Sequence, residues 1–389
     1  MVTPSDESAR AISPEQLKSK MSSTGFAFRG YNITNLGRTP ELLDHYMYRS
    51  IVERHLRDAG EVCEKVTGRP VDLVSQVRSR TETSAARYPE AVALICATEM
   101  AQLSLLEKFF GIQYHHTHLA FGFSLGEIVA LAAGGVFDWR VGMRVPLELA
   151  EDCAALAHDV SMGVLFSRDA VIPMEDVLRL CLRINNENDG LIGISSQLAP
   201  NAFLLLGQGS TVERFKARMH TQLSRTVNLR KNTDRWPPLH TAIVRLKYIP
   251  DRSANLLHTL EGGFMAPSVT TLSMVTGKAS YNDYNARDLL RKWTDHPQLL
   301  WDVVYETLWM GAQTMVHVGP MPNIIPSTFQ RLSDNVKTQI KANFGVWTLS
   351  EVVRRKWLQT ALPNRTALLR APFVRHVMLE DWLLAHAPG

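Results

Sequence analysis

A serine that lies between two closely spaced glycines is the residue of this sequence best placed to do chemistry. The segment Gly122-Phe123-Ser124-Leu125-Gly126 follows a short apolar run at 119–121 and precedes the helix-like stretch IVALAAGG. A serine on such a strand-to-helix turn is pushed clear of the backbone, and the glycines let the chain approach itself closely enough to make the turn. Ser124 is therefore a candidate nucleophile.

The start of the following helix could support this chemistry. There the backbone amide of Leu125 can donate to the oxyanion of a tetrahedral intermediate. A five-residue pattern also recurs by chance, however, and Ser124 with Glu127 spells an ordinary helix capping box, in which the serine is only structural. The pattern alone leaves both interpretations open.

Composition indicates a soluble globular protein. A chain of 389 residues, 45% hydrophobic and 21% charged, can bury a large core and is long enough for one large domain with an insert or two ordinary domains. No stretch approaches the roughly 20 uninterrupted apolar residues of a membrane span, and the polar opening at 1–20 lacks the apolar stretch of a secretory signal. We therefore expect a cytoplasmic protein that does not engage a membrane.

Cysteines and histidines give no sign of a metal site. The four cysteines stand singly, without a CxxC pair, and we interpret them as reduced core residues. The histidine cluster HHTH at 115–118 has no acidic or thiol partner close in sequence, which favours a structural role. We expect neither a metal nor a bound redox cofactor.

Basic residues gather in one segment of the chain. Residues 214–247 carry nine lysines and arginines against one acid, Asp234. Such a patch attracts phosphates or an acidic partner, although a solvated helix face is an equal alternative. Nucleic-acid binding would need interleaved aromatic residues, and only Phe215 and Trp236 are available, so we expect no nucleic-acid partner.

Alternating apolar runs and helical patterns predict an α/β protein. We expect strands at 25–30, 119–121, 268–277 and 314–320, a buried helix at 89–111, and helices at 284–292 and 301–310. From about residue 162 the elements shorten to the order βαββαβ, which is typical of a small ferredoxin-like fold. A capping box of Ser210 and Glu213 is expected to open its second helix.

These patterns divide the chain into a core, an insert and an extension. We assign residues 1–160 and 236–345 to the core and 161–235 to the ferredoxin-like insert. Residues 346–389 would form a helical extension, with an amphipathic helix at 346–362 and a short one at 379–387.

Several segments resemble one enzyme family in the same order along the chain. GFSLGEIVALAAGGVFDW (122–139) closely resembles the GHSLGE segment of malonyl-CoA:acyl carrier protein transacylases and of polyketide synthase acyltransferase domains. FAFRGYNITNLGRTPELL (26–43) is similar to the first strand and GQGSQ loop of that family, with Gly30-Tyr31-Asn32 in place of the glutamines. SMVTG (273–277), PQLLW (297–301) and VHVGP (316–320) resemble SNVTG, PVRW and VEVGP. The resemblance covers residues 24–331 and implies an α/β-hydrolase-like core with a ferredoxin-like insert.

The resemblance also implies a catalytic base. The family has a histidine after the insert, in a phrase similar to FHSPLM, and PLHTAIV (238–244) occupies that place here. His240 would take the hydroxyl proton of Ser124 and return it to the departing thiol. By the same resemblance, the backbone amide of Tyr31 would join Leu125 in the oxyanion hole, and the carbonyl of Met274 would orient His240.

Departures from the family concern the acyl group. Members that take malonyl carry an arginine about two dozen residues after the serine, which pairs with the free carboxylate. An ungapped comparison places Leu149 there, and residues 145–160 contain no lysine or arginine. Phe123 replaces a histidine before the serine, and the stretch ending at Leu239 matches neither specificity phrase of the polyketide acyltransferases. We therefore expect Phe123, Leu149 and Leu239 to line an acyl pocket that prefers neutral groups.

Together these inferences predict an acyl-CoA:acyl carrier protein S-acyltransferase of fatty acid or polyketide biosynthesis. Acyl-CoA, a substrate and not a bound cofactor, would acylate Ser124, and the thiol of acyl carrier protein would then remove the acyl group. The basic segment 214–247 would meet the CoA phosphates or the acidic carrier protein. The alternatives are an acyl thioester hydrolase and a catalytically silent relative that binds carrier protein.

Overall fold

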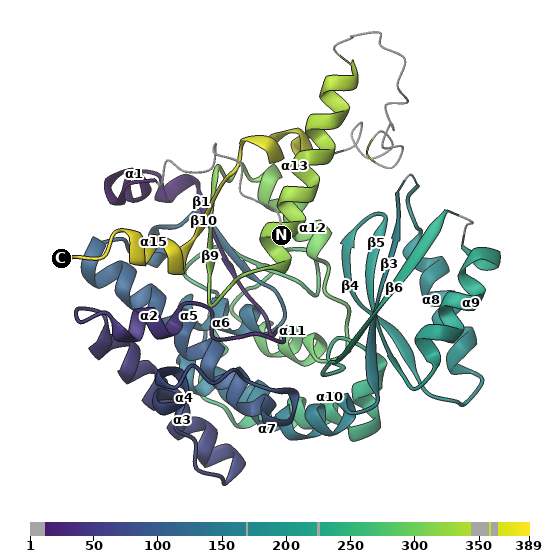
Figure 1. Cartoon of the computed structure of the whole chain (residues 1–389), viewed down its shortest axis with the longest axis horizontal. Helices are drawn as coiled ribbons and strands as arrows, with labels where there is room; N and C mark the ends of the chain where they lie inside the picture. Colours follow the sequence, from purple (N-terminus) through teal and green to yellow (C-terminus); the bar gives the residue numbers. More distant parts are fainter. Residues whose placement is uncertain (1–11, 169, 224–225, 344–357, 359–364) are drawn as a thin grey trace.

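The computed structural model describes residues 12–168, 170–223, 226–343, 358 and 365–389. A large domain is built around a mostly parallel sheet, and a smaller domain with its own sheet packs at one side of it (Figure 1). The smaller sheet and its two helices come from one continuous stretch of the chain, whereas the large domain uses the chain before and after it.

The large sheet has six strands in the order β10-β9-β1-β2-β7-β8. All neighbouring pairs are parallel except the last, in which β8 runs antiparallel to β7. The strands are β1 (Thr24–Phe28), β2 (Leu119–Gly122), β7 (Thr271–Ser273), β8 (Lys278–Ala279), β9 (Thr314–Val318) and β10 (Arg375–Met378).

Helices cover both faces of this sheet. In the central strand β1 all five residues are buried, as expected for a parallel strand with helices on both sides. Phe26 and Phe28 face one core cluster and Ala27 the other, since successive side chains alternate between faces. The helices are α1 (Pro14–Ser19), α2 (Thr39–Asp44), α3 (Arg49–Thr67), α4 (Leu73–Arg78), α5 (Tyr88–Phe110), α6 (Leu125–Ala133), α7 (Trp139–Ala157), α10 (Ile249–Thr259), α11 (Ala286–Trp293), α12 (Leu300–Trp309), α13 (Ile324–Asn343) and α15 (Leu379–Ala385).

Helix α5 is a long core helix, most of whose residues are buried. Pro89 occupies its first turn, and Gly111 ends it in the left-handed conformation with φ 61°. Within the described residues, the stretch Ala85–Phe110 is the one helical segment long and apolar enough to cross a membrane by length and composition, and most of it is buried inside the protein. It is therefore a core helix.

The smaller domain has the predicted ferredoxin-like topology. Its antiparallel sheet has the order β4-β5-β3-β6, and its elements are β3 (Val160–Ser167), α8 (Met174–Asn185), β4 (Ile192–Ala199), β5 (Ala202–Gln208), α9 (Thr211–Gln222) and β6 (Val227–Arg235). Apolar side chains of both helices and of the sheet form a separate core. The predicted capping box is wrong: Ser210 makes no side-chain cap bond, and Glu213 instead pairs with Lys231.

The other face of the small sheet packs against the large domain. Leu198 and Leu204 share a core cluster with Val304 of α12 and Phe329 of α13. Backbone contacts reinforce this joint, because β4 forms a parallel bridge between Ser196 and residue 298. The candidate functional site lies along this joint.

The chain end contributes more than the predicted helices. The short helix expected at 379–387 is present as α15, but it is preceded by β10, an edge strand that extends the main sheet beside β9. The helix expected at 346–362 lies almost entirely outside the described residues.

Candidate active site

Ser124 occupies a tight turn between β2 and α6. Its backbone has φ 53° and ψ −117°, which a residue with a side chain adopts rarely. A Cβ atom at Gly122 would lie 2.0 Å from the carbonyl carbon of Gly126, and one at Gly126 would lie 2.4 Å from the oxygen of Phe28. Only glycine fits at either position, so the two glycines of the motif make the turn possible.

The hydroxyl of Ser124 meets the imidazole of His240. The Oγ atom lies 2.7 Å from Nε2, across 116 residues of sequence. The Nδ1 atom of His240 lies 2.7 Å from the carbonyl oxygen of Trp293. Because that carbonyl can only accept, Nδ1 carries the proton and Nε2 is free to accept the proton of the serine. Burial lowers the pKa of His240 to about 4, and the bond to Trp293 offsets this in part, so the ring is neutral near pH 7.

The prediction that Met274 orients His240 is wrong. The carbonyl of Met274 accepts a hydrogen bond from the amide of Leu299 at 2.7 Å, and Trp293 holds the histidine instead. Met274 contributes differently: its amide donates to Glu127. The reason is that the loop packed against the imidazole is the one that follows α11, not the one that follows β7.

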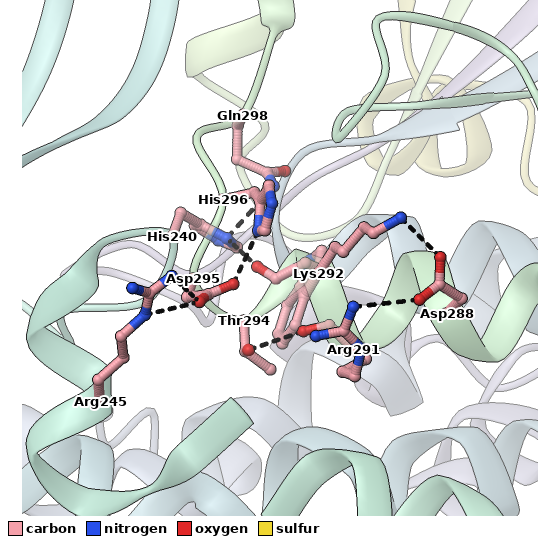
Figure 2. Close-up of polar contacts among 10 residues, drawn as sticks. His240, Arg245, Asp288, Arg291, Lys292, Thr294, Asp295, His296 and Gln298 are labelled. Atoms are coloured by element: carbon pink, nitrogen blue, oxygen red, sulfur yellow. Dashed lines mark hydrogen bonds and ion pairs between the residues drawn. The ribbon is translucent and has the colours of Figure 1, made fainter. Parts of the chain in front are cut away.

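Two further residues that the sequence analysis did not single out touch the catalytic pair. The indole Nε1 of Trp293 donates to the carbonyl of Ser124 at 2.9 Å, and the Oε1 atom of Gln298 accepts from the amide of Ser124 at 3.0 Å. Figure 2 shows Gln298 beside His240. The one available signal was a glutamine in the PQLLW stretch, where the resemblance has valine.

The capping-box alternative for Ser124 is not realised. Its side chain makes no cap bond and faces His240 instead. The buried carboxylate of Glu127 accepts from the amide of Met274 at 3.0 Å and from the hydroxyl of Tyr281 at 2.7 Å. Burial raises the pKa of Glu127 to about 7. Glu127 therefore ties α6 to the segment after β7.

The loop after β1 runs against the nucleophile. A Cβ atom at Gly30 would lie 3.1 Å from the Cβ of Ser124, so the neighbouring amide of Tyr31 is close to the serine. Arg29 fixes this loop: its Nε donates to the carbonyl of Gly30 at 2.7 Å, and its own amide donates to Glu99 at 2.8 Å. Burial lowers the pKa of Arg29 to about 10, and Glu99 opposes the shift.

The first turn of α6 packs directly against the start of this loop, because a Cβ atom at Gly126 would lie 2.5 Å from the carbonyl oxygen of Arg29. The amide of Leu125 belongs to that turn and has no acceptor within the helix. The amides of Leu125 and Tyr31 thus belong to two segments that lie next to Ser124. An oxyanion hole requires two such donors close to the nucleophile.

A cavity of about 310 Å³ opens in front of Ser124 and His240. Its walls come from both domains and are mostly apolar. The predicted pocket residues Phe123 and Leu239 line it, as does Tyr31. Its other apolar and aromatic lining residues are Tyr88, Met162, Val164, Leu198, Leu204, Leu206, Trp236, Pro237 and Ile324. Two arginines, Arg29 and Arg331, also reach it.

The structure does not place Leu149 in this cavity. Leu149 is buried in the main core cluster and is absent from the cavity wall. Tyr88 lines the cavity and lies within electrostatic range of Cys153, one turn after Leu149 on α7. The tyrosine therefore occupies the side of the cavity that faces α7. Its ring packs edge to face on Tyr31, with centroids 4.9 Å apart.

The basic segment is partly neutralised within the chain. Arg214 and Arg218 pair with Glu187, Lys231 with Glu213, and Arg245 with Asp295. A second cavity of about 580 Å³ adjoins the first, shares Arg331 with it, and is lined by two further arginines, Arg168 and Arg230. The three arginines of this second cavity come from the residue after β3 (Arg168), from β6 (Arg230) and from α13 (Arg331), so only Arg230 belongs to the segment 214–247.

The described residues contain no group of three or more histidine, cysteine or acidic side chains that could hold a metal ion. In the HHTH cluster, His118 uses its Nε2 atom to contact the carbonyl of Met310 at 2.9 Å. All four cysteines are buried and unpaired by disulfides.

This fold, with the small ferredoxin-like domain inserted and a serine at the turn after β2, is that of acyl carrier protein malonyltransferases. Similar solved structures include FabD from Acinetobacter baumannii (17% identity, 80% of this chain and 91% of that one, TM-score 0.64). An acyl carrier protein S-malonyltransferase from Vibrio cholerae is also similar (19%, 80% and 94%, 0.63), as is a malonyl-transacylase in complex with its type II polyketide acyl carrier protein (20%, 80% and 93%, 0.61). No family model and no curated protein matches the sequence.

Proposed function

We propose that this protein is a serine acyltransferase that moves an acyl group from CoA to the phosphopantetheine thiol of acyl carrier protein. The observation that carries the proposal is the 2.7 Å contact between the Oγ of Ser124 and the Nε2 of His240. In the first half-reaction His240 takes the hydroxyl proton, Ser124 attacks the thioester carbonyl, and the protonated histidine delivers its proton to the leaving CoA thiolate. The second half-reaction reverses these steps with the carrier thiol.

The amides of Leu125 and Tyr31 are the proposed oxyanion donors. Leu125 directly follows Ser124 at the start of α6, and Tyr31 follows Gly30, which lies against Ser124, and both placements support this role. The acceptor is proposed by analogy with the fold, because one similar structure is a transacylase bound to its acyl carrier protein. The cavity with Arg168, Arg230 and Arg331 offers positive charge for the phosphates of either thioester.

The acyl group is proposed to be neutral and apolar. Phe123, Leu239 and their neighbours from the small sheet give the cavity an apolar wall. Arg144, which could in principle replace the missing arginine, pairs with Glu148 and does not line the cavity. Arg29 already donates to the carbonyl of Gly30 and to Asn35. Among the described residues, Arg331 is thus the cation best placed to meet a malonyl carboxylate.

The experiment is a transfer assay with octanoyl-CoA and holo acyl carrier protein, in which every product is weighed by intact mass. The proposal expects octanoyl carrier protein and free CoA, with no transfer by the Ser124→Ala variant. Release of octanoic acid at the same rate with and without carrier protein would instead indicate a hydrolase. Absence of any product with acetyl-, octanoyl- and malonyl-CoA would indicate a silent relative.

A further inference from the structure

Both catalytic residues have strained backbones. Ser124 has φ 53° and His240 has φ 67°, although neither is glycine. A non-glycine residue stays in this conformation only where the surrounding structure holds it there. One short stretch, residues 293–298, contacts both of them, and we call it the 293–298 segment. It begins at the last residue of α11 and ends just before α12.

The 293–298 segment holds His240 through its backbone. The amide of His240 donates to the carbonyl of Thr294 at 2.7 Å, and its Nδ1 donates to the carbonyl of Trp293 at 2.7 Å. The imidazole also packs edge to face on the indole of Trp293, with ring centroids 5.1 Å apart. The ring can therefore neither rotate nor change its distance from the serine without breaking these contacts.

The same segment holds Ser124 through its side chains. The indole of Trp293 donates to the carbonyl of Ser124, and the amide of Ser124 donates to Oε1 of Gln298. Both backbone polar groups of the nucleophile are thus fixed from one side. Gln298 is fully buried, and in Figure 2 its side chain points to the imidazole of His240.

The bond to Ser124 sets the orientation of the Gln298 amide. Since the serine amide needs an acceptor, Oε1 must face it, and Nε2 then lies 3.2 Å from Nδ1 of His240. Both of those nitrogens carry protons when His240 acts as base, so this contact is not a hydrogen bond in that state. It places a partial positive charge beside the ring and disfavours the imidazolium.

Gln298 is itself anchored to the small domain. Its amide donates to Ser195, and its carbonyl accepts from the amide of Gln197 and from the hydroxyl of Ser196, each at 2.9 Å. The side chain that contacts both catalytic residues is therefore held at the joint between the two domains.

We propose that Trp293 and Gln298 are positioning residues, which hold the strained nucleophile Ser124 and its base His240 at the right distance and orientation. The proposal rests on the catalytic role of Ser124 and His240 proposed above. Its test accordingly measures the reactivity of Ser124 without any acyl donor or carrier protein. A fluorophosphonate, which labels activated serines, serves as the probe, and the labelled residue is mapped by mass spectrometry.

Two variants remove the side-chain contacts to Ser124, and each has a matched control. Gln298→Met and Trp293→Phe keep approximate size but lose the bonds to the serine. Gln76→Met and Trp382→Phe remove a part-buried bond to the carbonyl of Thr81 and a buried bond to the carbonyl of Ile12, and neither residue lines the cavity. We expect labelling to slow by roughly 10–100-fold in the first pair, as for a misplaced reacting group, and to stay within about twofold in the controls.

The third variant separates positioning from general packing. Gln298→Glu keeps an oxygen for the amide of Ser124 and puts a second one beside Nδ1 of His240. We expect the labelling rate at high pH to stay within about fivefold of the wild-type rate. We expect the acid limb of the pH–rate profile, where the labelling rate falls as His240 is protonated, to move upward by roughly 1–3 pH units, because a carboxylate favours the imidazolium. Purely structural damage would not move that limb.

The outcomes distinguish this inference from the proposed function. Absence of labelling at Ser124 in the wild-type protein would contradict the assignment of Ser124 and His240 as the catalytic pair, and with it the proposed function. Wild-type protein labelled at Ser124, with Gln298→Met and Trp293→Phe equally fast, would leave the function standing and overturn the positioning role. A Gln298→Glu variant as slow as Gln298→Met, with an unmoved acid limb, would overturn the role of Gln298 alone.

Discussion

Among the residues that the structure describes, the hydroxyl of Ser124 contacts one acceptor, the Nε2 atom of His240. The carbonyl of Trp293 fixes the tautomer, so no carboxylate is needed as a third member. A neutral hydrogen bond stabilises the imidazolium less than a carboxylate would. This suits a base that must return its proton to a thiolate in the same reaction.

Replacing His240 tests this assignment at the residue scale. We expect His240→Ala to lower the rate of Ser124 acylation by roughly 10²–10⁴-fold, the usual contribution of a positioned base, because no other acceptor contacts the hydroxyl. Stopped acylation reactions followed by intact mass would give the rate, and circular dichroism would verify the fold. A His240→Ala protein that acylates at the wild-type rate would exclude His240 as the base.

The pH dependence of acylation follows from burial of the same ring. Burial lowers the pKa of His240 from 6.5 to about 4, and the base acts only when it is neutral. The acylation rate should therefore stay level as the pH falls from 7 to about 5 and decline only near 4. Rates measured with a pH-stable thioester check this, and a decline centred near 6.5 would contradict the burial argument.

Sequence alone could locate the reacting atoms but not their supports. Ser124 lies in a local motif that identifies it. His240 was identified because several segments resemble the transacylase family in the same order along the chain. Trp293 and Met274 could not be told apart, because the carbonyl that meets Nδ1 is chosen by which of two loops packs on the ring. That packing depends on contacts about 50 residues apart, which no local pattern records.

At the scale of elements, the turn between β2 and α6 depends on the absence of a side chain at Gly126. A Cβ atom there would lie 2.4 and 2.5 Å from the carbonyl oxygens of Phe28 and Arg29. Because both contacts are backbone, the turn cannot relax by a rotamer change, and α6 would have to move away from β1.

We expect Gly126→Ala to lower the free energy of unfolding by at least about 1–3 kcal/mol and to abolish acylation. Gly142→Ala is the matched control: a Cβ atom there would make only ordinary contacts of 3.5 Å or more, inside helix α7. Urea unfolding of both variants gives the comparison. An unfolding free energy for Gly126→Ala equal to that of Gly142→Ala would show that the turn has room for a side chain.

Strands β9 and β10 are joined by a pair of histidines, of which His317 is fully buried and His376 is partly buried. Nε2 of His317 lies 2.8 Å from Nδ1 of His376, and the rings stack at 20°. Burial lowers the pKa of His376 to about 4. Burial also lowers the pKa of His317 well below its ordinary value, and the neighbouring His376 adds to that shift. Both rings are therefore neutral in the folded protein at pH 7, whereas in the unfolded chain they titrate near 6.5.

This pair should make the protein acid-sensitive. Lowered pKa values in the folded state mean stability that is complete above pH 6.5 and is lost as the pH falls toward 4. At about 1.4 kcal/mol per unit, His376 alone accounts for roughly 3 kcal/mol. We expect the double variant His317→Leu and His376→Leu to lose less stability than wild type between pH 6.5 and 4.5. Parallel Tm curves for the two proteins would refute this.

Long apolar runs predicted β1 and α5, because their burial is nearly complete along their length. The edge strand β10 was missed, since only Val377 of its four residues is buried and its pattern is too short to read. The capping box at Ser210 has the right spacing but fails because Glu213 finds a stronger partner in Lys231.

For the whole molecule, the decisive feature is that two domains share one cavity. The large domain supplies Ser124 and His240, while strands β3, β4 and β5 supply Met162, Leu198 and Leu204 to the wall. The acyl group would thus lie on the apolar face of the small sheet. Under the proposed function, placement of that domain, and not the Ser124–His240 pair, would determine which acyl groups fit.

We expect octanoyl-CoA to acylate Ser124 at least about tenfold faster than malonyl-CoA. Burying an unpaired carboxylate costs several kcal/mol, whereas each buried methylene gains about 0.8 kcal/mol. Second-order acylation rates for acetyl-, octanoyl- and malonyl-CoA provide the test. Arg331→Ala serves as control, because any malonyl activity that rests on this arginine would disappear in it. A tenfold preference for malonyl would show that the carboxylate has a partner.

The effective charge of the segment 214–247 in the folded molecule could not be predicted from the sequence. Nine basic residues in 214–247 suggested a continuous patch, but the fold brings Glu187, Glu213 and Asp295 beside them. These ion pairs neutralise part of the segment, and the second cavity gathers Arg168, Arg230 and Arg331. Leu149 was misplaced for a related reason, since an ungapped comparison cannot foresee that Tyr88 occupies the space in front of α7.

The most direct test of the central claim is the mass of the protein after brief incubation with octanoyl-CoA. The account predicts one added octanoyl group, mapped by peptide mass spectrometry to Ser124, absent from Ser124→Ala, and discharged when holo acyl carrier protein is added. An adduct that persists on Ser124→Ala, or that maps to another serine such as Ser161 or Ser210, would contradict it.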